Sequence, residues 1–76
     1  MHITMDNGAT HITPATRKGE FRVATTTQTR AKWIGGAFKV WTPYLKDGVM
    51  YYILPGRQVQ FMVNQTRREG GKVEGI

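Results

Sequence analysis

Hydrophobic and polar residues alternate along much of the chain, and a period of two predicts β-strands. The clearest stretch is residues 58–64, in which the side chains predicted to face a core are Val59, Phe61 and Val63. Residues 49–54 are apolar on both faces, which predicts either a central strand or a strand whose second face meets a partner. No segment of useful length repeats apolar residues at helical spacing, so the pattern predicts strands throughout.

Two more strands are predicted upstream. Residues 20–27 alternate, with Phe21 predicted to face inward and Arg22 outward. Residues 31–42 form a further predicted strand that contains the pair Gly35-Gly36. Two glycines inside a strand are typical of a bulge or a sharp bend, which allows a short sheet to curl.

Turn residues separate these segments. Lys46-Asp47-Gly48 predicts a hairpin turn before residues 49–54, and Leu54-Pro55-Gly56-Arg57 predicts another after them. A short strand is also expected near Ile3. The chain is therefore expected to be all-β: a small, strongly bent antiparallel sheet, or a Src-homology-like barrel, of about four to five strands.

The chain length allows one small domain. With 76 residues the core is limited, so a large enzyme with a deep cleft of its own is excluded. We expect a single β domain over residues 1–65, in which residues 1–19 are loosely attached. Residues 66–76 carry three glycines and mixed charges, and they are predicted to form a flexible tail.

Positive charge is concentrated in the part expected to fold. The net charge is +6, and residues 17–57 hold eight basic and two acidic residues. Charge of this sign favours an anionic partner such as nucleic acid. A net charge of about 2–8 in magnitude also serves solubility alone, so the charge does not by itself require such a partner.

Aromatic residues lie next to basic ones, as in Lys32-Trp33 and Lys39-Val40-Trp41. Such a surface suits single-stranded nucleic acid or RNA, because cations follow the phosphates while rings stack on bases. One tryptophan is expected to be buried and the other exposed, and Trp41 is predicted to be the exposed one because it shares a strand face with Lys39. The candidate nucleic-acid-binding residues are Arg22, Arg30, Lys32, Lys39, Trp41, Tyr44, Tyr52 and Arg57.

The sequence gives little support for catalysis, and we expect a non-enzymatic protein without a cofactor. Serine and cysteine are absent, and the five acidic residues form no convincing pair for acid–base chemistry. His2 and His11 have no evident partners for a metal site, so no metal is expected. No phosphate-binding or dinucleotide-binding glycine loop is present.

A second function class fits almost as well. Small basic proteins of phages and other mobile elements often bind an acidic host protein or a nucleoprotein complex and inhibit or regulate it. The size and composition of this chain resemble those of such proteins. Residues 49–54 would then supply interface anchors, or alternatively mediate a homodimer. The sequence contains no recognisable signal peptide or membrane span, so a cytoplasmic location is expected.

Overall fold

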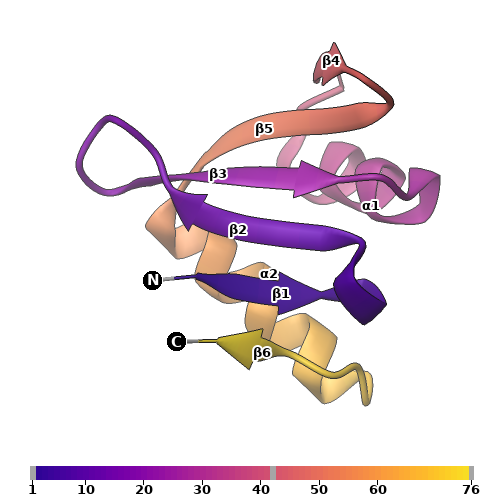
Figure 1. The fold of residues 1–76 in the computed structure, drawn as a ribbon. Coiled ribbons are helices and arrows are strands. Elements are labelled where there is room, and N and C mark those ends of the chain that lie inside the picture. Colours follow the sequence, from indigo (N-terminus) through magenta and orange to yellow (C-terminus); the bar gives the residue numbers. More distant parts are fainter. Residues whose placement is uncertain (1, 42, 76) are drawn as a thin grey trace.

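The computed structural model describes residues 2–41 and 43–75, which form a sheet and two helices (Figure 1). The elements in chain order are β1 (Ile3–Met5), the short 3₁₀ turn η1 (Asp6–Gly8), β2 (Thr10–Pro14), β3 (Glu20–Thr25), α1 (Gln28–Phe38), β4 (Tyr44–Lys46), β5 (Val49–Pro55), α2 (Gly56–Arg68) and β6 (Glu74–Gly75).

The sheet has six strands in the order β4-β5-β3-β2-β1-β6, and each neighbouring pair is antiparallel. Figure 1 shows both helices behind this sheet, so one face is covered and the other is open. The predicted antiparallel sheet is confirmed. The all-β class and the barrel are wrong, because two helices cover one face and the sheet is not closed.

The core lies between the covered face and the helices. Alternate strand residues point inward and meet one side of each helix, as the period of two requires. The buried apolar residues are Met5, Ile12, Val23, Ile34, Met50, Tyr52, Leu54, Val59, Met62 and Val63. In β3 the predicted orientation is confirmed, since Val23 is buried and Arg22 is exposed. The outward positions of the same strands form the open face.

Helix α1 replaces the strand predicted over residues 31–42, and that prediction is wrong. The helix begins after Thr27, whose hydroxyl accepts a hydrogen bond from the Arg30 amide at 3.1 Å. This is the N-capping role that threonine performs well. Lys39 takes a left-handed conformation (φ 60°) and ends the helix. Thr42, the last residue of the predicted strand, lies outside the described residues.

The glycine pair sits inside α1, and its first member is in contact with an aromatic ring. A Cβ atom on Gly35 would lie 2.5 Å from Cε3 of Trp41, whereas a Cβ on Gly36 would meet open space. Gly35 therefore allows the Trp41 ring to pack against the helix backbone. This close approach, and not a strand bulge, explains the glycine at this position.

Helix α2 replaces the predicted hairpin at residues 54–57 and the predicted strand at residues 58–64, which are both wrong. Pro55 stands at the N-cap, where its missing amide hydrogen is no loss. The residues that α2 buries recur at helical spacing: Val59, Met62, Val63 and Thr66. After the helix Gly70 (φ 85°) donates to Arg67, and Gly71 donates to Thr66, so the last carbonyls are capped.

Both ends of the chain join the sheet. The first nineteen residues, expected to attach loosely, contribute β1 and β2 to its interior. Residues 66–76, expected to form a flexible tail, include the end of α2 and the edge strand β6, which pairs with β1. Met1 and Ile76, the outer limits of these two predicted segments, lie outside the described residues.

Candidate nucleic-acid interface

The open face carries a hollow with mixed aromatic and basic walls. Its volume is about 410 Å³, and it is lined by Arg22, Tyr44, Lys46, Tyr51 and Ile53. These residues come from the neighbouring strands β3, β4 and β5. No helix covers this side of the sheet (Figure 1), so among the described elements the hollow opens directly to solvent.

The turn between β4 and β5 brings the two tyrosines together. Asp47 and Gly48 both have positive φ angles (53° and 79°), as a tight two-residue hairpin turn requires. This confirms the predicted turn and sets the pairing of Tyr44 with Tyr51. Their ring centroids are 6.0 Å apart and their planes are tilted by 48°. The pair forms one wall of the hollow.

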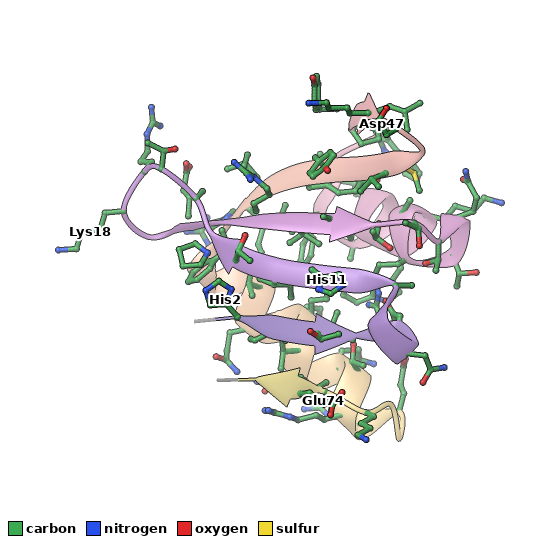
Figure 2. The ribbon with its side chains drawn as sticks, viewed as in Figure 1. His2, His11, Lys18, Asp47 and Glu74 are labelled. Carbon is green, nitrogen blue, oxygen red and sulfur yellow. The ribbon has the colours of Figure 1, made fainter. Side chains whose placement is uncertain are left out.

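The pairing of β3 with β5 places the basic and the apolar residue of the hollow opposite each other. Arg22 pairs with Ile53, and Ala24 pairs with Tyr51. Beyond Ala24, the next residue across the sheet is His11, which Figure 2 shows over β2. Because the Ala24 side chain is small, it leaves space beside the Tyr51 ring, and a planar group can lie there.

The hollow combines two kinds of interaction. Arg22 and Lys46 are both exposed and carry positive charge, which suits phosphate oxygens. Tyr44 and Tyr51 offer rings, and Ile53, 52 % exposed, offers an apolar surface. Rings and cations on an open sheet are the combination by which several RNA-binding modules hold single strands.

The predicted site residues separate into several places. Arg22 and Tyr44 lie on the open face, as described above. Tyr52 is only 4 % exposed and faces the core, so its prediction as a stacking residue is wrong. Burial raises the pKa of the Tyr52 hydroxyl. The alternation of β5 explains the error, because adjacent tyrosines point to opposite faces.

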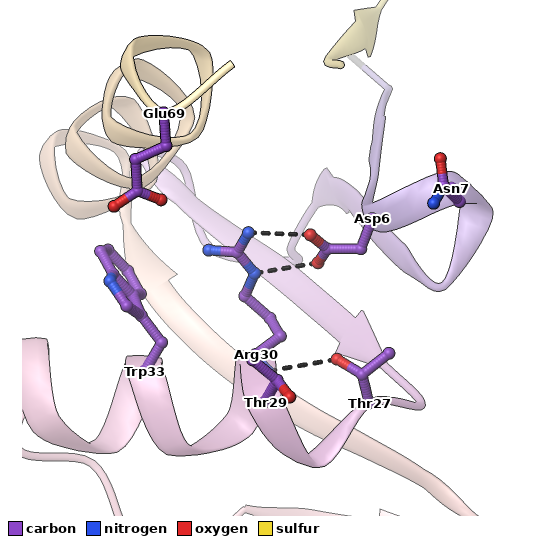
Figure 3. A pocket seen from close by; sticks show the side chains of 7 residues that line it. All are labelled: Asp6, Asn7, Thr27, Thr29, Arg30, Trp33 and Glu69. Carbon is purple, nitrogen blue, oxygen red and sulfur yellow. Dashed lines mark hydrogen bonds and ion pairs between the residues drawn. The ribbon is translucent and has the colours of Figure 1, made fainter. Parts of the chain in front are cut away.

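Arg30 is engaged in an ion pair with Asp6. Its Nη2 lies 2.8 Å from Oδ1 of Asp6, and its Nε donates to Oδ2 at 2.9 Å (Figure 3). Only 12 % of the arginine side chain and 22 % of the aspartate side chain are exposed. The hydrogen bonds from Arg30 lower the pKa of the Asp6 carboxyl, against an opposing effect of burial. Arg30 therefore lies in an ion pair away from the open-face hollow, and its predicted contact with phosphate stays a prediction.

The same pair belongs to a network that joins the sheet to both helices. The Thr10 hydroxyl donates to Oδ2 of Asp6 at 2.5 Å and lies 2.9 Å from the Thr25 hydroxyl. Nη2 of Arg30 also donates to the hydroxyl of Thr66 in α2 at 3.2 Å. The polar groups of this network satisfy one another, which indicates a structural role.

A hollow of about 370 Å³ lies beside this network. Figure 3 shows its lining, which consists of Asp6, Asn7, Thr27, Thr29, Arg30, Trp33 and Glu69. The guanidinium carbon of Arg30 lies 5.4 Å from the centre of the Trp33 ring. Trp33 also packs against Phe38 and Phe61, with centroids 5.5 and 6.3 Å away. The contact with Phe61 joins α1 to α2, so Trp33 acts as a packing residue.

The remaining predicted residues lie away from the open face. Lys32 and Trp41 line a separate hollow with Pro43 and the largely buried Tyr52, on the side of the sheet that carries α1. Trp41 is 66 % exposed, which confirms the prediction that it is the exposed tryptophan. Lys39 caps α1, and Arg57 lies in the first turn of α2 instead of at a hairpin tip. The open-face hollow and the hollow lined by Lys32 and Trp41 share no lining residue, so the predicted residues do not form one surface.

Three residues of the open-face hollow were not predicted: Lys46, Tyr51 and Ile53. A signal for the last two was present, because residues 49–54 are apolar on both faces, which predicted either a central strand or a strand whose second face meets a partner. A signal for Lys46 was present in the Asp47-Gly48 turn, which fixes the register of the hairpin.

Comparisons with known proteins give no assignment. No protein-family model matches the chain, and no curated protein and no solved structure gives a significant match. Among residues 2–41 and 43–75, no three side chains of the histidine, aspartate and glutamate types gather in a way that could hold a metal ion. In the same residues, neither helix is long and apolar enough to cross a membrane.

Proposed function

We propose that this protein binds single-stranded nucleic acid on the open face of its sheet, without a catalytic step. The observation that carries the proposal is the hollow between β3, β4 and β5, in which two tyrosines stand beside an arginine and a lysine. The net charge of +6 supports the same kind of partner, because it attracts phosphates over a longer range.

Each lining residue has a role in this binding mode. A base stacks on Tyr51 above the small Ala24, and Tyr44 closes the side of the hollow. Stacking of this kind contributes about 1–3 kcal/mol per base. Arg22 and Lys46 contact the phosphates on either side of that base. Duplex nucleic acid is excluded from this mode, since its bases are already stacked on one another.

The first test measures binding by fluorescence anisotropy. Labelled single-stranded DNA, RNA and duplex DNA are titrated with the protein at about 50 and 200 mM salt. We expect a preference for single strands, and a loss of affinity of about tenfold or more in Tyr51→Thr. Threonine keeps a high preference for β-structure, so the variant isolates the ring from the fold. Thermal melting of each variant confirms that it is folded.

A matched pair of variants, each lacking one basic side chain, distinguishes binding at the open-face hollow from nonspecific attraction by the net charge. Arg22→Ala and Lys32→Ala remove the same charge, but Lys32 lies on the helix side of the sheet. We expect the Arg22 variant to weaken binding several times more than the Lys32 variant. Equal losses, together with no effect of Tyr51→Thr, would show that binding is a nonspecific effect of the net charge.

Tryptophan fluorescence gives an independent measurement of the location. Trp33 and Trp41 both lie away from the open face, on α1 and just after it. Binding on the open face should therefore leave tryptophan emission nearly unchanged. Strong quenching on addition of single strands would instead place the ligand beside Trp41 and Lys32, and would contradict the proposed surface.

A protein partner is the second candidate, and the exposed apolar residues around β4 favour it. Trp41 and Leu45 are each 66 % exposed, and large apolar side chains of this kind serve as anchors in protein interfaces. The partner would be a host protein or nucleoprotein complex that the chain inhibits or regulates. Capture from nuclease-treated lysate that is lost in Leu45→Ala, but kept in Tyr51→Thr, would favour this function over nucleic-acid binding.

A further inference from the structure

Another hollow adjoins the open-face hollow, at the end of the sheet where the loop between β2 and β3 lies. Its volume is about 630 Å³, and it is lined by Ala15, Thr16, Arg17, Glu20, Arg22 and Ile53. We propose that it is a guanine subsite, in which Glu20 accepts hydrogen bonds from the base next to the one stacked on Tyr51. This inference rests on the proposed function and adds a base preference and a ligand longer than one nucleotide.

The two hollows are neighbours on the open face. Arg22 and Ile53 line both of them and are cross-strand partners, so they form the boundary between the two. Tyr51 and Ile53 are two residues apart on β5, a separation of about 6.6–6.8 Å. This distance is on the scale of one nucleotide in an extended strand. A strand that places one base on Tyr51 therefore places its neighbour over the second hollow.

The loop that forms the far wall is held by backbone hydrogen bonds. The Glu20 amide donates to the Arg17 carbonyl at 3.1 Å, and the Ala15 amide donates to the Glu20 carbonyl at 3.0 Å. The Gly56 amide, at the start of α2, donates to the Gly19 carbonyl at 2.9 Å. These bonds fix the loop to the sheet and to α2, so the hollow has a defined shape before any ligand binds.

Glu20 supplies an acceptor that is free for a ligand. It lies two residues before Arg22 on β3 and therefore points to the same open face. Among the described residues, its carboxylate takes part in neither of the two ion pairs and in none of the side-chain hydrogen bonds. A carboxylate repels phosphate and accepts hydrogen bonds, so Glu20 suits a donor group of a base and not the strand's backbone.

Guanine fits this acceptor better than the other bases do. Its Watson–Crick edge carries adjacent N1–H and N2–H donors, which match the two oxygens of a carboxylate. Uracil and thymine offer one such donor between two carbonyls, and cytosine and adenine place an acceptor beside their amino group. Proteins read the exposed Watson–Crick edges of single strands in this way. Arg22 and Arg17 contact the phosphates that flank the guanine.

The test compares two labelled RNA strands of about eight nucleotides, one containing only uridine and one with a single central guanosine. We expect the wild-type protein to bind the guanosine strand about tenfold more tightly, the discrimination expected of a bidentate contact. Glu20→Gln should remove this preference. Glu74→Gln is the matched control, because Glu74 is an exposed acid at the far edge of the sheet (Figure 2), and this variant should keep the preference.

The outcomes separate the subsite from the proposed function. If Glu20→Gln strengthens binding to both strands by the same factor, Glu20 acts only through its charge and the guanine subsite is wrong. Equal binding of both strands by the wild-type protein also overturns the subsite, while a large effect of Tyr51→Thr would still support the stacking site. If neither strand binds more tightly than duplex and Tyr51→Thr has no effect, the proposed function itself fails.

Discussion

Replacing Arg30 with alanine should lower the free energy of unfolding by about 2–3 kcal/mol. Removal of one partner from a buried ion pair typically costs about 3–5 kcal/mol, because the other charge remains unpaired. The figure is reduced here because 12 % of the Arg30 side chain and 22 % of the Asp6 side chain are exposed. A chain of this size is expected to have an unfolding free energy of about 4–11 kcal/mol. The melting temperature should therefore fall by about 10–20 °C.

The loss should depend on pH in a defined direction. In the folded wild-type protein Arg30 lowers the pKa of Asp6, so the pair stabilises the fold fully above the unfolded pKa of about 3.9. This stability disappears as the pH falls through the lower, folded pKa. In Arg30→Ala burial still raises the pKa of Asp6 and the Thr10 hydroxyl still lowers it, and burial is the larger of the two effects. Protonation of Asp6 then relieves the penalty. The difference between wild type and variant should shrink as the pH falls below about 4.

Urea denaturation at several pH values measures both effects. Arg57→Ala is the matched control, since it removes the same charge from an exposed position on α2 and should change stability by no more than about 0.5 kcal/mol. A loss of less than about 1 kcal/mol at neutral pH in Arg30→Ala, or a loss that does not change in acid, would contradict the stabilising role of this ion pair. Binding of single strands by the folded variant should match wild type, because Arg30 is absent from the open-face hollow.

Three further predictions concern the core and α1. Gly36→Ala should stabilise the protein by about 0.5–1 kcal/mol, because the position is helical and a Cβ there meets open space. Gly35→Ala should instead displace the Trp41 ring, seen as a change in tryptophan emission, since a Cβ would lie 2.5 Å from that ring; unchanged emission would contradict the packing. Leu54→Ala should lose about 2–5 kcal/mol in urea denaturation, because the side chain is fully buried. A loss below about 1 kcal/mol would contradict the core assignment.

Two strands were predictable from the sequence, one from its alternation and one from an apolar run between turn signals. Residues 20–27 include β3, residues 49–54 cover β5 up to Leu54, and the Asp47-Gly48 turn lies where it was predicted. In these segments the local preferences and the burial pattern favour the same structure. A prediction from local sequence is reliable where the local preference and the burial pattern agree.

The two helices were missed because some residues suit both a helix and a strand or turn, and the strand or turn was predicted. Pro55-Gly56 suits a hairpin turn, but proline is also favoured at the start of a helix. The alternation of Val59, Phe61 and Val63 suits a strand, but Met62 interrupts it and completes a helical stripe. Packing against the sheet favours the helical pattern over the strand pattern. In the helix Met62 is fully buried, whereas Phe61 is 53 % exposed.

Helix α1 was harder to predict. Gly35 lowers helix preference by about 1 kcal/mol relative to alanine, and nothing nearby in the sequence explains its presence. The reason is its contact with Trp41, which follows the helix and folds back onto it. The site was only partly predictable for a similar reason. Arg22 and Tyr51 are distant in sequence, and only the pairing of β3 with β5 brings them into one hollow.

The fold alone does not account for the composition of the open face. Outward positions of an antiparallel sheet covered on one side are ordinarily polar, because they face water. Tyrosine and isoleucine favour strands, so the preference for β-structure explains Tyr51 and Ile53 one at a time. It does not explain why both border the same hollow as Arg22 and Lys46. If strand preference were the whole reason, Tyr51→Thr would leave the binding of single strands unchanged. A variant that is equally stable but binds single strands more weakly would assign the ring to recognition.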